Sequence, residues 1–168
     1  MVAHNIELSN AELITCANMG VMRRISALNK DRQPQYGIKG SSEWQADITG
    51  AIGEYVLSKA LNICWSPAIG ELDKHTGDVN GYQVRATEHT NGHLILGDRD
   101  KNDDVFVLIT GNNRVAKHWT VRGWCYGREA KQKEYWKDMG NNGRPAFFYP
   151  QKELRDIAEL LSGYIHKN

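Results

Sequence analysis

The sequence is poor in cysteine and contains no long hydrophobic run. Among its 168 residues only Cys16, Cys64 and Cys125 are cysteines, and no two of them form a CxxC pair. This pattern argues against a disulfide framework and a zinc knuckle, and it predicts reduced thiols. The longest uninterrupted apolar run, Val105 to Ile109, is too short to cross a bilayer. The N-terminus lacks the basic and apolar stretches of a secretory signal, so we expect a cytoplasmic protein with no membrane partner.

The chain also lacks internal repeats, low-complexity segments and linkers, which predicts one domain over residues 1–168. A chain of this length buries a core without disulfides or structural metal. We expect an α/β fold, an α/β/α sandwich in which helices flank a central mixed β-sheet of about five strands. Two long helices are predicted over residues 9–29 and 42–62. Strands are predicted over 93–96, 105–110 and 119–126, the last of them kinked. Two final helices are predicted over 128–138 and 151–164.

The two long helices differ in their polar residues. In the first, which opens with a Ser9-to-Glu12 capping box, the apolar stripe leaves Arg23 and Arg24 for solvent. In the second, Glu54 falls on an apolar face, where a carboxylate is costly unless it is ion-paired, protonated or bound to metal. A structural salt bridge and a metal site both explain Glu54. The inward stripe of the first helix consists of Leu13, Ala17, Val21, Ile25 and Leu28.

Residues 77–85 predict a β-hairpin. Its turn is Asn80-Gly81, a favoured pair because both central residues of a type I′ turn need positive φ. On the strand that follows, Gln83 and Arg85 are two residues apart and point to the same face. Such a hairpin can gather Asp78, Gln83 and Arg85 around one point. The same residues also fit the polar face of an ordinary sheet.

The order of these residues resembles the PD-(D/E)XK nuclease superfamily. There, a core helix supplies an acid, one strand supplies an Asp, and the next strand supplies [D/E/Q]-x-K; this chain has Glu54, Asp78 and Gln83-x-Arg85. The GAIGE segment that ends at Glu54, together with a later Gly-Trp pair, is similar to small phage and prokaryotic members. The resemblance covers about residues 43–126. It implies a restriction-endonuclease-like fold and cleavage of nucleic acid, DNA more than RNA.

The resemblance also implies a Mg²⁺ or Mn²⁺ site. Asp78 would be the central metal ligand, Gln83 a second through its amide oxygen, and Val84 a third through its main-chain carbonyl. Glu54 would coordinate through a water or bind a second ion. Arg85 stands in place of the superfamily's lysine, beside the attacking water and the scissile phosphate. Phosphodiester hydrolysis needs such a cation to neutralise developing charge and acidify water, and Mg²⁺ takes oxygen ligands.

Two of these residues depart from the superfamily's usual pattern. Gln83 is neutral, so the site has one negative charge fewer and holds Mg²⁺ less firmly. Arg85 does not deprotonate in a protein and is therefore no general base, although its planar fork can orient water or clamp phosphate. Three functions stay open: a metal-dependent nuclease, a nuclease-fold module that has lost catalysis and binds nucleic acid or a protein, and a protein-interaction factor. A homodimer is compatible with each.

Charge is distributed unevenly, although the net charge is only +1. Residues 111–152 contain nine Lys or Arg and three acids, whereas residues 71–109 contain eight acids and four bases. This asymmetry favours a surface for a polyanion next to a pocket for a cation, and ordinary solvated faces are the alternative. Cations interleave with aromatic residues over 117–137, a pattern typical of nucleic-acid binding and also of buried tryptophans between solvated charges. The candidate nucleic-acid-binding residues are Lys117, Arg122, Arg128 and Lys131.

Overall fold

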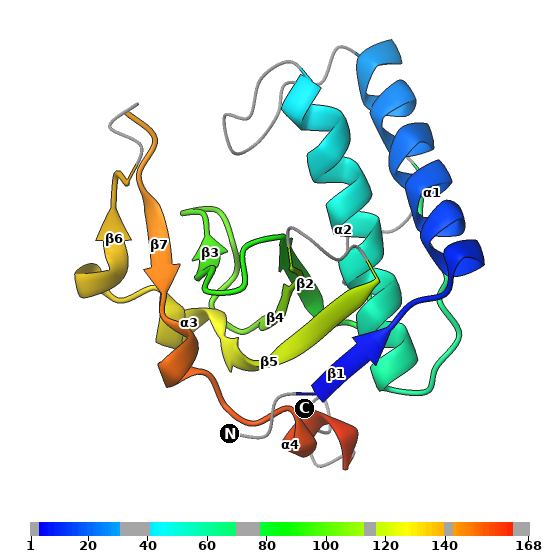
Figure 1. The fold of residues 1–168 in the computed structure, drawn as a ribbon. Coiled ribbons are helices and arrows are strands. Elements are labelled where there is room, and N and C mark those ends of the chain that lie inside the picture. The colour runs from blue at the N-terminus through cyan, green and yellow to red at the C-terminus, as the bar shows by residue number, and fades with distance from the viewer. Residues whose placement is uncertain (1–3, 31–40, 70–77, 113–116, 140–142, 163–168) are drawn as a thin grey trace.

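A computed structural model describes residues 4–30, 41–69, 78–112, 117–139 and 143–162 of the chain (Figure 1). Two long helices, α1 (Asn10–Asn29) and α2 (Ser41–Ala60), pack against each other. The predicted capping box opens α1, because the Ser9 hydroxyl accepts from the Glu12 N–H and the Glu12 carboxylate accepts from the Ser9 N–H. The helices approach closely at Gly20, where a Cβ would lie 2.5 Å from the Ile48 Cα.

The central sheet has four strands in the order β1-β5-β4-β2. β5 pairs antiparallel with both β1 and β4, whereas β2 pairs parallel with β4 and forms the edge of the sheet. Every residue of β4 is buried, as predicted for a central strand that is covered on both faces. The strands are β1 (His4–Glu7), β2 (Gln83–Thr87), β4 (Val105–Thr110) and β5 (His118–Tyr126).

A β-bulge kinks β5, as the sequence predicted. The pairing register with β4 shifts between Leu108 and Ile109. Gly123 lies on β5 beside the shift, with a φ of 146°, and packs so close to the Arg155 carbonyl oxygen that a Cβ has no room. The bulge therefore needs glycine for both its backbone angle and its packing.

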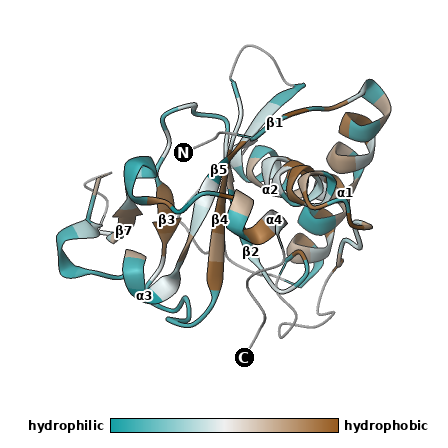
Figure 2. Cartoon of the chain, turned by 90° about the horizontal axis from the view of Figure 1, so that it is seen from below, coloured by the Kyte–Doolittle hydropathy of each residue, from teal (hydrophilic) through white to brown (hydrophobic). Residues whose placement is uncertain are grey.

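The two faces of the central sheet are covered by different layers (Figures 1 and 2). α2 lies over one face and buries Val84, Val107 and Ile109 in the larger apolar core. A second sheet, in the order β3-β7-β6, covers the other face and buries Phe106 and Leu108 in a smaller core. The remaining elements are β3 (Leu94–Leu96), α3 (Gly127–Ala130), the 3₁₀ turns η1 (Lys133–Tyr135) and η2 (Gln151–Glu153), β6 (Trp136–Lys137), β7 (Ala146–Tyr149) and α4 (Ala158–Leu161).

The architecture is mixed α/β, as expected, but two details of the expectation need correction. Among the described residues the central sheet has four strands rather than about five. Its second face is covered mainly by another sheet, since the predicted helix over 128–138 breaks into α3, η1 and β6. The predicted helix over 151–164 is likewise interrupted, because Arg155 pairs with Trp124 of β5 by main-chain hydrogen bonds in both directions.

Candidate functional site

The Asn80-Gly81 turn forms as predicted and determines where Asp78 lies. Both turn residues have positive φ, 47° and 81°, and Val79 pairs with Tyr82 across the turn. The strand expected before the turn is reduced to this single bridge, and Gly77 lies outside the described residues. The tight turn returns the Asp78 carboxylate to the following strand, where its Oδ2 accepts from the Val84 N–H at 2.7 Å.

Arg85 lies at the same edge of β2, on the face of the central sheet that α2 does not cover. Its guanidinium donates to the Val84 carbonyl at 3.1 Å and lies 4.0 Å from Asp78 Oδ2. A second nitrogen donates to Asp100 Oδ1 at 2.9 Å, and the group stacks 5.1 Å from the Phe106 ring centre. Arg85 therefore lies beside two of the predicted metal ligands, Asp78 and the Val84 carbonyl.

Glu54 lies on α2, which packs against β2, and is ion-paired. It follows Gly53, whose missing Cβ would lie 2.5 Å from the Ala86 Cβ of β2. The carboxylate is only 9% exposed, and its two oxygens accept from the Arg23 guanidinium at 2.5 and 2.8 Å. The Trp65 indole N–H adds a third hydrogen bond at 3.3 Å. The salt-bridge explanation of Glu54 is thus confirmed, and Arg23 is a residue of the site that the sequence reasoning placed in solvent.

The charges of these groups depend on one another. Burial raises the pKa of Glu54, and the hydrogen bonds and positive charge of Arg23 oppose that rise. The negative charge of Asp78 raises the pKa of Glu54 further, so the two carboxylates are close enough to repel. Burial opposes the charge on Arg23, but the hydrogen bonds and charge of Glu54 raise the pKa of Arg23 overall. Glu54 therefore depends on Arg23 for its ionised form.

The structure thus brings three of the predicted residues together at the edge of β2, Asp78, Val84 and Arg85, whereas the printed partners of Glu54 are Arg23 and Trp65. Gln83 is the first residue of β2 and lies half-buried, and its side chain makes no hydrogen bond to a described residue. Val84 and Ala86 face α2, so Gln83 and Arg85 lie on the other face of β2. This arrangement agrees with the predicted alternation of side chains along the strand.

A helical wheel could have identified Arg23. It lies three residues after Gly20, and Arg24 lies four residues after it, so both share the face on which Cys16 and Gly20 are buried. Arg24 is indeed buried, at 7% exposure, and pairs with Glu43 and Asp47.

Two oxygen groups at the edge of β2 are of the type that a hard divalent cation takes as ligands. Among the described residues, no group of three or more His, Cys, Asp or Glu is placed to hold a metal, whereas Asp78 and the Val84 carbonyl are carboxylate and carbonyl oxygens of the kind that Mg²⁺ prefers. A cation beside Asp78 would have to displace the Arg85 guanidinium from the Val84 carbonyl and from its ion pair with Asp78, while Asp100 retains the arginine. Arg23 engages both oxygens of Glu54.

Two of the four candidate nucleic-acid-binding residues contact the acidic turn 98–104. Arg128 pairs with Asp103 at 3.1 Å and stacks on Tyr126, and Lys131 donates to two main-chain carbonyls of the acidic turn 98–104. These two cations therefore bind the protein's own acidic turn. Lys117 precedes β5 and Arg122 lies within it, where the Arg122 Nε donates to the Thr110 hydroxyl at 2.6 Å.

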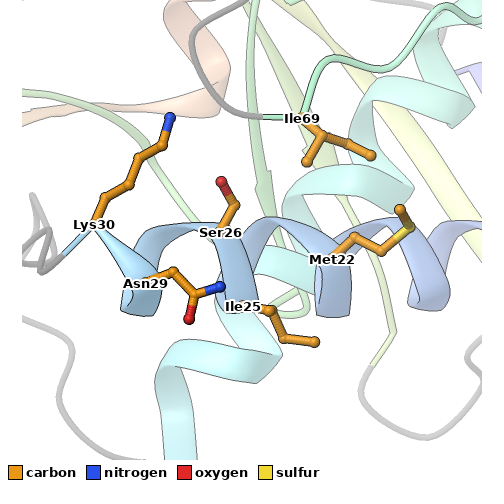
Figure 3. A pocket seen from close by; sticks show the side chains of 6 residues that line it. All are labelled: Met22, Ile25, Ser26, Asn29, Lys30 and Ile69. Atoms are coloured by element: carbon orange, nitrogen blue, oxygen red, sulfur yellow. The ribbon is translucent and has the colours of Figure 1, made fainter.

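A separate hollow of about 350 Å³ lies on α1, away from these charges (Figure 3). Its lining residues include one cation and no carboxylate. Its lining residues are Met22, Ile25, Ser26, Asn29, Lys30 and Ile69.

Comparison with known proteins identified no relative of this chain. No family model matches the sequence, and no curated protein or solved structure matches it either. All three cysteines are free, as predicted. Within the described part of the chain, every helix is too short or too polar to cross a membrane.

Proposed function

We propose that this chain is a divalent-metal-dependent nuclease with a restriction-endonuclease-like core, which hydrolyses phosphodiester bonds in nucleic acid, DNA rather than RNA. One observation carries the proposal: Asp78, the Val84 carbonyl and Arg85 meet at the outer edge of β2, and Glu54 lies on α2, the helix that packs against β2. Together they come from a helix, a hairpin and a strand, in the order of the resemblance. The mixed four-stranded sheet with helices on one face is compatible with such a core, and the free thiols fit a reducing cytoplasm.

Each residue has a chemical task in this proposal. Asp78, the Val84 carbonyl and the Gln83 amide would hold Mg²⁺ or Mn²⁺, which when bound acidifies water and neutralises charge on the phosphate. Arg85 stabilises the phosphate by charge-assisted hydrogen bonds, since it is always protonated and takes no proton from water. Its anchor on Asp100 keeps the guanidinium oriented toward the edge of β2.

Plasmid cleavage in Mn²⁺ or Mg²⁺ tests the proposal. Asp78→Asn retains an oxygen that accepts from the Val84 N–H but removes the charged ligand, so we expect cleavage to fall at least about 100-fold, or 2.7 kcal/mol of barrier. Asp103→Asn is the matched control, because that carboxylate is 92% exposed and distant in its contacts from the site. Supercoiled DNA, single-stranded DNA and RNA should each be tried. If wild-type protein cuts none of them with either metal, the proposal is wrong.

A second candidate function is a nuclease-fold module that binds nucleic acid or a protein without cutting. The observation that favours it is the neutralisation of both carboxylates, Glu54 by Arg23 and Asp78 by Arg85. Under this candidate, binding of an oligonucleotide should weaken as salt rises, without cleavage in any metal. Cleavage that Asp78→Asn abolishes would rule it out.

A further inference from the structure

Arg23 is fixed by contacts of a different kind from those of Arg85. Its guanidinium faces both oxygens of Glu54 as a two-pronged fork, at 2.5 and 2.8 Å. Its Nε also donates to the Ala68 carbonyl at 3.0 Å, in the segment that leads toward Asp78. Three hydrogen bonds therefore fix Arg23, and the planar fork matches the carboxylate geometry in a way that a metal ion or a lysine does not.

The same contacts leave Glu54 without a vacant oxygen. Arg23 occupies one position at each carboxylate oxygen, and the Trp65 N–H shares Oε2. Glu54 is 9% exposed and Arg23 21% exposed, so little water competes for the pair. The negative charge of Asp78 also raises the pKa values of both Glu54 and Arg23. A buried carboxylate next to another carboxylate needs a cation nearby, and here the protein itself supplies it.

We propose that the Arg23 guanidinium takes the place of a second divalent cation at Glu54, so that the site binds one metal ion, beside Asp78, and not two. The inference rests on the proposed function for that one ion. Glu54 then acts as the partner that positions Arg23, rather than as a metal ligand. Arg85 differs because its guanidinium lies at the proposed ligands of that one ion, where it donates to the Val84 carbonyl and lies 4.0 Å from Asp78 Oδ2.

The stoichiometry of Mn²⁺ binding tests the inference without any measurement of cleavage. Calorimetry and the electron paramagnetic resonance of free Mn²⁺ should both give one ion per wild-type chain. Arg23→Gln removes the built-in charge and frees Glu54, so the number should rise to two. The double variant Arg23→Gln/Glu54→Gln should return it to one, which assigns the second ion to Glu54. Arg23→Lys retains the positive charge and should stay at one.

The outcomes separate this inference from the proposed function. Two ions on the wild-type chain, or one ion on a folded Arg23→Gln variant, would overturn the inference and leave the nuclease proposal standing. No ion on the wild-type chain would overturn the nuclease proposal. If the wild-type chain binds no ion but Arg23→Gln binds one, the result still supports the inference that Arg23 excludes a cation from Glu54. If neither protein binds an ion, both the inference and the nuclease proposal are wrong. If Arg23→Gln does not fold, the wild-type and Arg23→Lys counts decide, since two ions on either contradicts the inference.

Discussion

Two arginines of the candidate site lie on opposite sides of the central sheet, and their surroundings differ. Arg23 comes from the helix side and is fixed by three hydrogen bonds, two of them to a buried carboxylate. Arg85 comes from the side that the second sheet covers, with one hydrogen bond to Val84 and its anchor on Asp100. The comparison suggests a division within the site: the helix side is a rigid structural half, and the Arg85 side is the half that adjusts to a ligand.

The largest expected effect is on stability, when the rigid half is broken. Arg23→Gln leaves the Glu54 charge buried without its partner, so we expect the free energy of unfolding to fall by about 3–5 kcal/mol. Urea denaturation at neutral pH measures it. The double variant with Glu54→Gln removes both charges and should recover most of the loss. A double variant that is no more stable than the single one would show that the pair is not the cause.

Close packing on the helix side predicts a second, smaller loss. Gly53→Ala places a Cβ 2.5 Å from the Ala86 Cβ, and overpacking of this kind costs about 1–3 kcal/mol. Gly50→Ala is the matched control on the same helix, because its Cβ would meet no described atom within 4 Å. That change should stabilise the protein by up to about 1 kcal/mol through helix propensity. Thermal unfolding of the two variants should therefore shift in opposite directions, and equal shifts would contradict the close approach of α2 to β2.

On the adjustable half, Arg85→Lys should increase metal-dependent cleavage. Lysine can shift its pKa and exchange protons, which arginine does not do, and it releases the Val84 carbonyl to a metal ion. We expect a gain of about tenfold in rate, equivalent to 1.4 kcal/mol. Arg144→Lys serves as the control, since that residue is exposed and is not among the candidate site residues. An unchanged rate in Arg85→Lys would mean that the arginine is not what limits catalysis.

The smallest expected effect concerns acid stability of the helix pair. The hydrogen bond from Lys59, with those from Ser9 and Tyr55, lowers the pKa of Glu12 from 4.5 to about 2. The folded state therefore binds fewer protons than the unfolded state between these values, and the stability that Glu12 contributes is present above pH 4.5 and lost as pH falls toward 2. Urea denaturation of Glu12→Gln should show a deficit at pH 6 that shrinks by pH 2.5. A deficit that is constant with pH would refute the assignment.

Short sequence patterns correctly predicted the turn and the strands of the site, because neighbouring residues determine their backbone conformation. Asn80-Gly81 forms its turn because few other residue pairs tolerate two positive φ values in a row. The alternation along β2 follows from strand geometry, which places Val84 against α2 and Arg85 on the other face. The strand over 105–110 was equally clear, since a continuous apolar run of that length needs cover on both faces.

The orientation of α1 was predicted wrongly, because tertiary contacts determine it. The apolar stripe pointed to Ile25 and Leu28 as core residues, yet these are 46% and 56% exposed. The buried face runs instead through Cys16, Gly20 and Arg24. Small residues let α1 approach α2 closely, and acids on α2 supply partners for the arginines. Those partners are 19 to 31 residues away in sequence, beyond what periodicity within one helix reveals.

The pairing within the second sheet could not be predicted for a similar reason. The strand predicted over 93–96 forms as β3, but β3 and β7 are strands of three and four residues, too short for their periodicity to indicate a pairing partner. Their pairing joins segments about 50 residues apart, and β1 pairs with a strand more than 100 residues later. Short strands of this kind are stabilised by partners that only the folded chain provides.

The path of the chain between β2 and β4 has a consequence for how the protein unfolds. The two strands are parallel neighbours, so the chain must cross over between them, and it does so through β3 of the second sheet. Asp100, which holds Arg85, lies on that crossover, and the Gln151 side chain ties its beginning at Thr90 and Gly92 to the C-terminal region. Detaching β3 would therefore loosen β2 and free Arg85 in one step. The two sheets should melt as one cooperative unit, with the candidate site lost at the same temperature as the fold.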